Sequence, residues 1–191
     1  MAKKVVILLA EGFEEVEAIT PVDYLRRAGI EVQIAALGGN LAVTGSHGIQ
    51  VNADISFSGD GFPLDWDGVI VPGGGPGSDR LAASKEAGLF LKEMAGKGKW
   101  ICAICAAPAR VLAPLGLLAG KKFTCYPGEE GKVSGAEWKE DRVVVDGNLI
   151  TSRGPGTAGE FACAIIDRLN GAGGADSEGS KIAAKALLAL P

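Results

Sequence analysis

The chain has 191 residues, of which 47% are hydrophobic and 22% are charged, and its formal net charge is -4. This composition is typical of a globular protein with a sizeable core and excludes an intrinsically disordered chain. The acidic balance also excludes the basic surface of a nucleic-acid-binding protein. We therefore expect a single domain over residues 1–191, in which 171–191 form a connection and a short C-terminal helix.

Apolar runs alternate with helical segments, and this order predicts an α/β fold with a mainly parallel sheet covered on both faces. The expected strands are 4–10, 31–37, 68–71, 99–104, 122–125, 142–145 and 149–152, with short β-like pieces within 41–51. The expected helices are 14–28, 84–95, 107–115, 157–169 and 182–190, the last with Ser180 as its N-cap.

The segment 100–119 is nearly uncharged and about long enough to cross a bilayer. It contains Arg110, Pro108 and Pro114, so a buried strand followed by a buried helix explains it better. No signal peptide is expected, because the apolar run after Lys4 is short and is broken by Glu11. We therefore expect a cytoplasmic protein, without a membrane or nucleic-acid partner, whose four cysteines are reduced thiols.

Cys105 lies where an apolar strand stops and a helix begins, in the run Ile-Cys-Ala-Ile-Cys-Ala-Ala-Pro over 101–108. The first N–H groups of a helix and its dipole favour negative charge, so a thiol at this turn is expected to ionise easily. The geometry parallels the nucleophile elbow of hydrolases. The alternative is a buried cysteine that serves as a small hydrophobic residue.

Two further loops follow strands, at Glu11-Gly12 and at Gly73-Gly74-Gly75. The carboxyl ends of parallel strands meet at one edge of a sheet, so these loops are expected to converge with Cys105 in one crevice. Glu17 lies one turn into the helix after the first loop. Taken alone, it reads as a solvated carboxylate that favours the helix N-terminus.

Other chemistries fit the cysteines and glycines less well. Cys102 and Cys105 form a CxxC, but Cys102 lies inside the strand, so a redox pair is disfavoured. A zinc site needs Cys125 and Cys163 as well, and Cys163 falls on the apolar side of a helix. The glycines after Pro72 lack the Lys-Ser/Thr of a phosphate-binding loop. We expect no metal and no organic cofactor.

Six stretches of the sequence carry a family resemblance through their order and spacing. They are 11–17, 21–23, 26–30, 71–74, 103–106 with Pro108, and 151–157, and together they cover roughly residues 4–170. In this combination the chain resembles the ThiJ/PfpI superfamily and, within it, the DJ-1 branch. The resemblance implies a flavodoxin-like three-layer sandwich that forms a homodimer.

The resemblance also implies roles for individual residues. Cys105 matches the reactive cysteine of the family, and Glu17 matches the acidic residue that contacts its sulfur as a protonated carboxyl. A protonated carboxyl donates a hydrogen bond to the thiolate, whereas an ionised one repels it. The backbone N–H groups of Gly74 and Ala106 match the donors of an oxyanion hole.

This sequence departs from the family pattern at a histidine that often lies beside the cysteine. Tyr126 stands at that position, and the lone histidine, His47, lies upstream in a Gly-flanked loop. A Cys-His dyad is therefore not expected, and Ala106 in place of a histidine argues against a peptidase. Tyr126 and His47 are candidates for orienting the substrate, although a surface role is the default for His47. The remaining candidate accessory residues are Gly73, Arg27, Gly154 and Pro155.

The resemblance implies a glyoxalase or deglycase activity on reactive carbonyls such as methylglyoxal, or on glycated adducts, without glutathione. In this reading Cys105 is the nucleophile and Glu17 transfers the proton. The alternative is an oxidative-stress sensor or holdase-like protein in which Cys105 is oxidised to a sulfinic acid.

Overall fold

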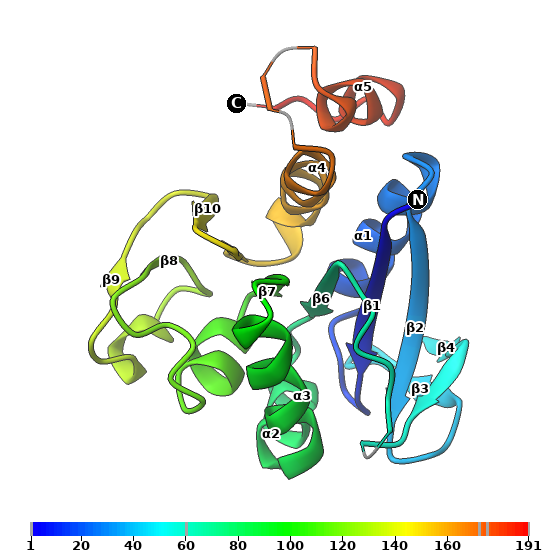
Figure 1. Cartoon of the computed structure of the whole chain (residues 1–191), viewed down its shortest axis with the longest axis vertical. Coiled ribbons are helices and arrows are strands. Elements are labelled where there is room, and N and C mark those ends of the chain that lie inside the picture. Colours follow the sequence, from blue (N-terminus) through cyan, green and yellow to red (C-terminus); the bar gives the residue numbers. More distant parts are fainter. Residues whose placement is uncertain (1, 60, 172, 175, 191) are drawn as a thin grey trace.

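The computed structural model describes residues 2–59, 61–171, 173–174 and 176–190 (Figure 1). Its central sheet has seven strands in the order β10-β11-β7-β6-β1-β2-β5, all parallel to their neighbours except β10. These strands are β1 (Lys4–Leu9), β2 (Glu31–Leu37), β5 (Ile55–Phe57), β6 (Gly68–Val71), β7 (Trp100–Ile104), β10 (Val143–Asp146) and β11 (Leu149–Ser152). The mixed α/β fold with a mainly parallel sheet is the predicted one.

Two layers of helices cover the sheet, because side chains of successive strand residues point to opposite faces. One apolar core packs α1 (Glu15–Arg27), α4 (Ala158–Leu169) and α5 (Glu178–Lys185) against one face. The other core packs α2 (Gly75–Ala83), α3 (Lys85–Gly96) and the π-helix η1 (Pro108–Leu112) against the opposite face. Figure 1 shows α4 and α2 on opposite sides of β6 and β7. This arrangement leaves the carboxyl ends of the strands free for loops.

Smaller elements lie outside the central sheet. β3 (Ala42–Thr44) and β4 (Gln50–Asn52) pair as a hairpin where short β-like pieces were expected within 41–51, and β8 (Lys122–Phe123) pairs with β9 (Glu137–Trp138). β10 and β11 are antiparallel and joined through Gly147, which has a positive φ of 61°. The short 3-10 helix η2 (Glu130–Lys132) follows Tyr126. A second 3-10 helix, η3 (Pro155–Thr157), directly precedes α4.

The helices differ from the sequence prediction in three places. α2 was not predicted, because the glycines and the proline that open it are typical of a loop. The helix expected over 107–115 is the shorter π-helix η1. The last helix begins earlier than predicted, since Ser177 and not Ser180 is its N-cap and accepts a hydrogen bond from the Ser180 N–H. The parts of the expected 171–191 segment at 172, 175 and 191 lie outside the described residues.

The segment 100–119 is β7 followed by η1, which agrees with the prediction of a buried strand and a helical segment. Within the described ranges, no helix combines the length and apolar character that a bilayer crossing requires.

Candidate active site

Cys105 lies on a sharp turn between β7 and η1, as predicted. Its φ is 64°, in the left-handed region that non-glycine residues rarely adopt. The Cys105 N–H donates to the Ser152 carbonyl (3.0 Å), and the Tyr126 N–H donates to the Cys105 carbonyl (2.8 Å). The end of β11 and the loop that carries Tyr126 therefore hold the cysteine in this strained conformation, which is the geometry of a nucleophile elbow.

The predicted convergence of three loops at the strand ends is present. The Gly77 N–H donates to the Gly12 carbonyl (3.1 Å), and the Glu14 N–H donates to the Gly73 carbonyl (3.0 Å). A Cβ built on Gly74, whose φ is 85°, would lie 2.4 Å from the Gly12 carbonyl oxygen. Glycine is therefore required at position 74 both by its backbone conformation and by the close approach of the first loop.

Glu17 is fully buried and is not the solvated carboxylate that its position alone suggests. Its Oε2 accepts a hydrogen bond from the Gly73 N–H (2.9 Å), and its Oε1 has no hydrogen-bond partner. A Cβ built on Gly73 would lie 2.4 Å from Glu17 Oε2 and 3.0 Å from Cys105 Sγ. The carboxyl and the sulfur therefore approach each other across the bare Cα of Gly73.

Burial raises the pKa of Glu17 to about 8, although hydrogen bonds with Cys105 and with the Gly73 N–H oppose the increase. At neutral pH this carboxyl is mostly protonated. A protonated carboxyl adds no charge beside the sulfur and has a proton to donate. This protonation state is the one that the family resemblance implied.

The thiol of Cys105 does not ionise as easily as the sequence predicted. Burial raises its pKa, and the charge of an ionised Glu17 raises it further. Hydrogen bonds from the N–H groups of Ala106 and Gly74 act in the opposite direction and lower it. The prediction considered the helix start and omitted burial, which is the larger influence. Cys105 and Glu17 therefore titrate as a pair, and the thiol ionises more readily while Glu17 keeps its proton than after Glu17 has ionised.

Tyr126 and Gly154 lie beside Glu17. A Cβ on Gly154 would be 3.3 Å from Cδ2 of Tyr126 and 3.9 Å from Oε1 of Glu17. The Tyr126 side chain is 49% exposed, so its ring borders the buried carboxyl and also faces solvent. The structure thus brings together Cys105, Glu17 and Tyr126.

The His47 side chain contacts the carboxylates at the start of α1. Its Nδ1 lies 3.0 Å from Glu15 Oε2 and 3.5 Å from Glu14 Oε2. The hydrogen bond with Glu15 raises the pKa of His47, and the pKa of Glu15 is held at about 2, because hydrogen bonds led by His47 outweigh the effect of burial. The donor atoms of Glu14, Glu15 and His47 lie within 4.8 Å of one another, close enough to hold a metal ion. The hydrogen bond between His47 and Glu15 and the ion pair between His47 and Glu14 account for the same arrangement.

Two predicted accessory residues lie apart from the sulfur. Arg27 forms an ion pair with Asp23 (2.6 Å) and is ten residues beyond Glu17, about 15 Å along the same helix. Pro155 is exposed at the start of η3, next to Gly154. Arg27 therefore serves the end of α1, and Pro155 shapes the turn that carries Gly154.

The other three cysteines are buried, and all four are free thiols. Burial raises the pKa of Cys125 to about 12 and that of Cys163 to about 11. Cys102 lies inside β7 and is fully buried. Cys105 is the only partly exposed thiol of the four.

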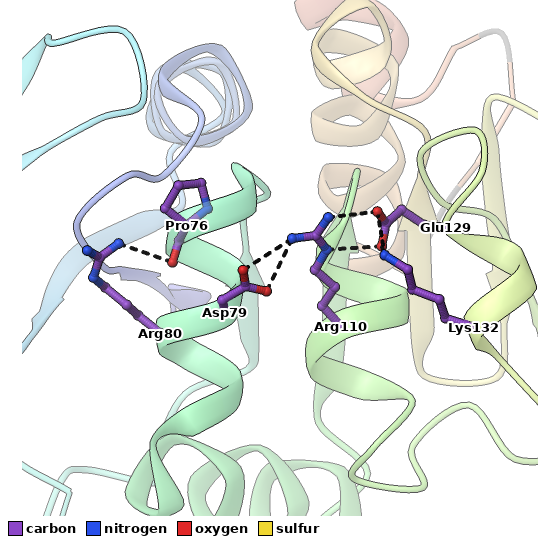
Figure 2. A network of polar contacts seen from close by, with 6 residues as sticks. All are labelled: Pro76, Asp79, Arg80, Arg110, Glu129 and Lys132. Atoms are coloured by element: carbon purple, nitrogen blue, oxygen red, sulfur yellow. Dashed lines mark hydrogen bonds and ion pairs between the residues drawn. The ribbon is translucent and has the colours of Figure 1, made fainter.

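A polar network beside the elbow was not predicted. Arg110 of η1 donates to the carboxylates of Glu129 and Asp79, and Lys132 also pairs with Glu129 (Figure 2). The signal in the sequence was the charge of Arg110 within an almost uncharged segment, since a partly buried charge needs a partner.

The model of the DJ-1/PfpI family matches residues 3–168. Protein DJ-1 homolog B of Arabidopsis thaliana is 42% identical over 168 residues, which are 88% of this chain and 38% of that protein. This chain thus spans about two fifths of the Arabidopsis protein.

Two other relatives match over most of their length. A deglycase of Pyrococcus abyssi is 37% identical over 155 residues, which are 80% of this chain and 91% of that protein. The structure of oxidized Toxoplasma gondii DJ-1 has a TM-score of 0.91 and 38% identity, covering 99% of this chain and 100% of that one. The chain belongs to the DJ-1/PfpI family.

Proposed function

We propose that this protein is a cysteine-dependent enzyme that converts reactive carbonyl compounds such as methylglyoxal to hydroxy acids without glutathione. The observation that carries the proposal is the approach of the buried Glu17 carboxyl to the Cys105 side chain across Gly73. A relative in Pyrococcus abyssi is named a deglycase, and glycated adducts are the related substrate class.

The first step is addition of the Cys105 sulfur to the aldehyde carbon. The S–C bond forms as the sulfur gives up its proton to solvent, and the carbonyl double bond becomes a C–O single bond. The Glu17 carboxyl protonates that oxygen, which gives a hemithioacetal and leaves Glu17 as a carboxylate. The N–H groups of Gly74 and Ala106 already lower the pKa of the Cys105 thiol, and we assign them to stabilising the negative charge that develops on the oxygen. No metal or organic cofactor is required by this step.

Glu17 then moves the proton that turns the hemithioacetal into a thioester. Its carboxylate removes the hydrogen from the former aldehyde carbon, and the resulting enediol is protonated at the neighbouring carbon. Water hydrolyses the thioester, which releases lactate and restores the thiol. A pKa of about 8 suits a group that both accepts and donates protons near neutral pH.

The assembly is proposed to be a homodimer. Val16 and Ile19 are 47% and 39% exposed on one face of α1, and Ile49, whose N–H donates to Glu15, is 58% exposed beside them. Ile19→Glu is expected to give a monomer by analytical ultracentrifugation. Leu89→Glu, on α3 and at a side chain that is 67% exposed, is the matched control and keeps the dimer. A wild-type protein that sediments as a monomer refutes this assignment.

The test of the activity is lactate formation from methylglyoxal by freshly reduced protein without glutathione. Wild type and a Cys163→Ala control are expected to turn over, while Cys105→Ala is expected to be inactive. Full activity of Cys105→Ala refutes the mechanism.

The second candidate function is oxidation sensing. It is favoured because Cys105 is partly exposed, whereas the other three cysteines are buried. A low concentration of peroxide should then oxidise Cys105 selectively to a sulfinic acid, with Glu17 as hydrogen-bond donor. Peptide mapping that finds equal oxidation of all four thiols excludes this candidate.

A further inference from the structure

The polar network of Figure 2 has no role in the chemistry proposed above, yet a single side chain lies at its centre. The Nε and Nη2 of Arg110 donate to the two carboxylate oxygens of Glu129 (3.0 and 2.8 Å). Its Nη1 donates to both carboxylate oxygens of Asp79 (3.2 and 3.3 Å). One guanidinium group therefore joins η1, α2 and the loop after β8.

Each of these three segments carries a part of the candidate site. The Arg110 N–H donates to the Ala106 carbonyl (2.9 Å), one turn back toward the sulfur. Asp79 lies in the first turns of α2, which begins directly after Gly74. The Glu129 N–H donates to the Tyr126 carbonyl (3.0 Å). Arg110, Asp79 and Glu129 thus form a bridge between three segments. This bridge connects the backbone that carries the Gly74 and Ala106 N–H groups with the loop that carries Tyr126.

The bridge is partly shielded from solvent, unlike an ordinary surface ion pair. The side chains of Glu129 and Arg110 are 12% and 27% exposed. Hydrogen bonds from Arg110 hold the pKa of Glu129 at about 2, so the pair stays ionised through the neutral range. A two-pronged arginine–carboxylate contact fixes both distance and angle, which an exposed single contact does not.

The backbone around Arg110 directs its side chain toward α2. Arg110 lies within a π-helical turn, in which the Ala113 N–H donates to the Pro108 carbonyl (3.0 Å). Such turns are rare and occur frequently at functional sites. A Cβ on Gly75 would lie 3.4 Å from Arg110 Nη1, so the guanidinium group rests against the first residue of α2.

We propose that Arg110 is a positioning residue that sets the separation of the Gly74 and Ala106 N–H groups and holds the Tyr126 loop beside them. Its effect on turnover rests on the proposed function. Its effect on the reactivity of Cys105 does not, because the same two N–H groups lower the pKa of the thiol in the free protein.

The test compares Arg110→Met with wild type by two measurements. The first is the rate of Cys105 alkylation by iodoacetamide as a function of pH, and its profile is expected to shift to higher pH. The second is turnover of methylglyoxal, for which kcat is expected to fall roughly tenfold with KM changed less than about twofold. This expected loss of kcat is smaller than the roughly 10²–10³-fold loss that follows removal of an oxyanion donor. The two N–H donors remain in Arg110→Met but lose their fixed spacing.

Two variants separate positioning from stability. Arg110→Lys keeps the charge but not the two-pronged contact, and it is expected to recover part of kcat. Arg26→Met is the control, because Arg26 also links its helix to a distant segment, through an ion pair with Asp54 (3.1 Å), at the far end of α1. Arg26→Met is expected to leave both measurements unchanged.

An alkylation profile and a kcat within about twofold of wild type for Arg110→Met overturn the proposal. If Arg110→Met does not fold, Asp79→Asn decides by the same criteria, because it removes one carboxylate of the bridge. If wild type itself has no turnover, the proposed function fails, and the alkylation profiles still decide the role of Arg110.

Discussion

Glu17 on α1 and Cys105 on the turn after β7 meet across a single glycine, Gly73. A Cβ on Gly73 would lie 2.4 Å from Glu17 Oε2 and 2.6 Å from Cys105 Cβ. Neither neighbour can yield easily, since Glu17 is fully buried and Cys105 is held in a left-handed conformation. The pair therefore depends on the absence of a side chain at position 73.

Gly73→Ala is expected to lower turnover at least tenfold and to reduce thermal stability, because overpacking a close-packed site costs about 1–3 kcal/mol. Gly96→Ala is the matched control, because no atom lies within 4 Å of the Cβ it would add near the end of α3. That control is expected to keep full activity and to gain slightly in melting temperature. Equal activity of the two variants would contradict the proposed contact.

Glu17→Gln tests the proton-transfer role. Glutamine keeps the shape and can still accept the Gly73 N–H, but it cannot take up or release a proton at neutral pH. Turnover is expected to fall by about 10²–10⁴, the usual contribution of general acid–base catalysis. Glu31→Gln, at an exposed carboxylate at the start of β2, serves as control in the same kinetic assay. A Glu17→Gln variant with near wild-type kcat would rule out this role.

The raised pKa of Glu17 also predicts how stability depends on pH. The folded protein binds this proton up to a pH of about 8, whereas the ordinary value is 4.5. The contribution of this proton to the free energy of unfolding is therefore complete below about pH 4.5. It declines as pH rises toward 8, by at most about 1.4 kcal/mol per pH unit. Urea unfolding of wild type and Glu17→Gln across this interval measures the slope.

The Glu17→Gln variant is expected to lose most of that decline, since it has no proton to release at this position. It is therefore expected to be more stable than wild type above pH 8. Identical slopes in the two proteins would show that Glu17 ionises in the folded state as readily as in the unfolded state.

Tyr126 is expected to contribute through its hydroxyl group to substrate orientation. It borders Gly154 and is half exposed, so Tyr126→Phe should leave the melting temperature unchanged. Loss of one neutral hydrogen bond of about 1 kcal/mol raises KM roughly fivefold, with kcat nearly constant. Steady-state kinetics of Tyr126→Phe measure both values, and an unchanged KM would assign the tyrosine to packing alone.

The sequence predicted most of the sheet, because long apolar runs such as 4–10 and 99–104 have few alternatives to a buried strand. It also predicted the elbow at Cys105 and the meeting of three strand-end loops. It missed α2. The Gly-Pro-Gly that opens α2 favours a turn in isolation, and tertiary packing overrides this preference and makes the segment helical.

The local sequence pattern does not predict the electrostatics of the site, although the family resemblance implied a protonated Glu17. The Glu17 carboxyl follows two other glutamates at a helix start, where exposure is the usual outcome, and only the packed structure buries it. The same burial reverses the predicted direction of the Cys105 pKa. The contacts of Arg110 also depend on loops distant in sequence, since Asp79 and Glu129 are identified as partners only once the chain is folded.

The central claim, that Cys105 bonds to the carbonyl substrate and Glu17 then moves the proton, is tested most directly by mass spectrometry of acid-quenched reactions with methylglyoxal. Fragmentation of peptide 100–110 distinguishes Cys105 from Cys102. We predict a substrate-derived mass on Cys105 alone, at higher occupancy in Glu17→Gln than in wild type. Turnover without any adduct on Cys105, or equal modification of all four cysteines, would contradict the account.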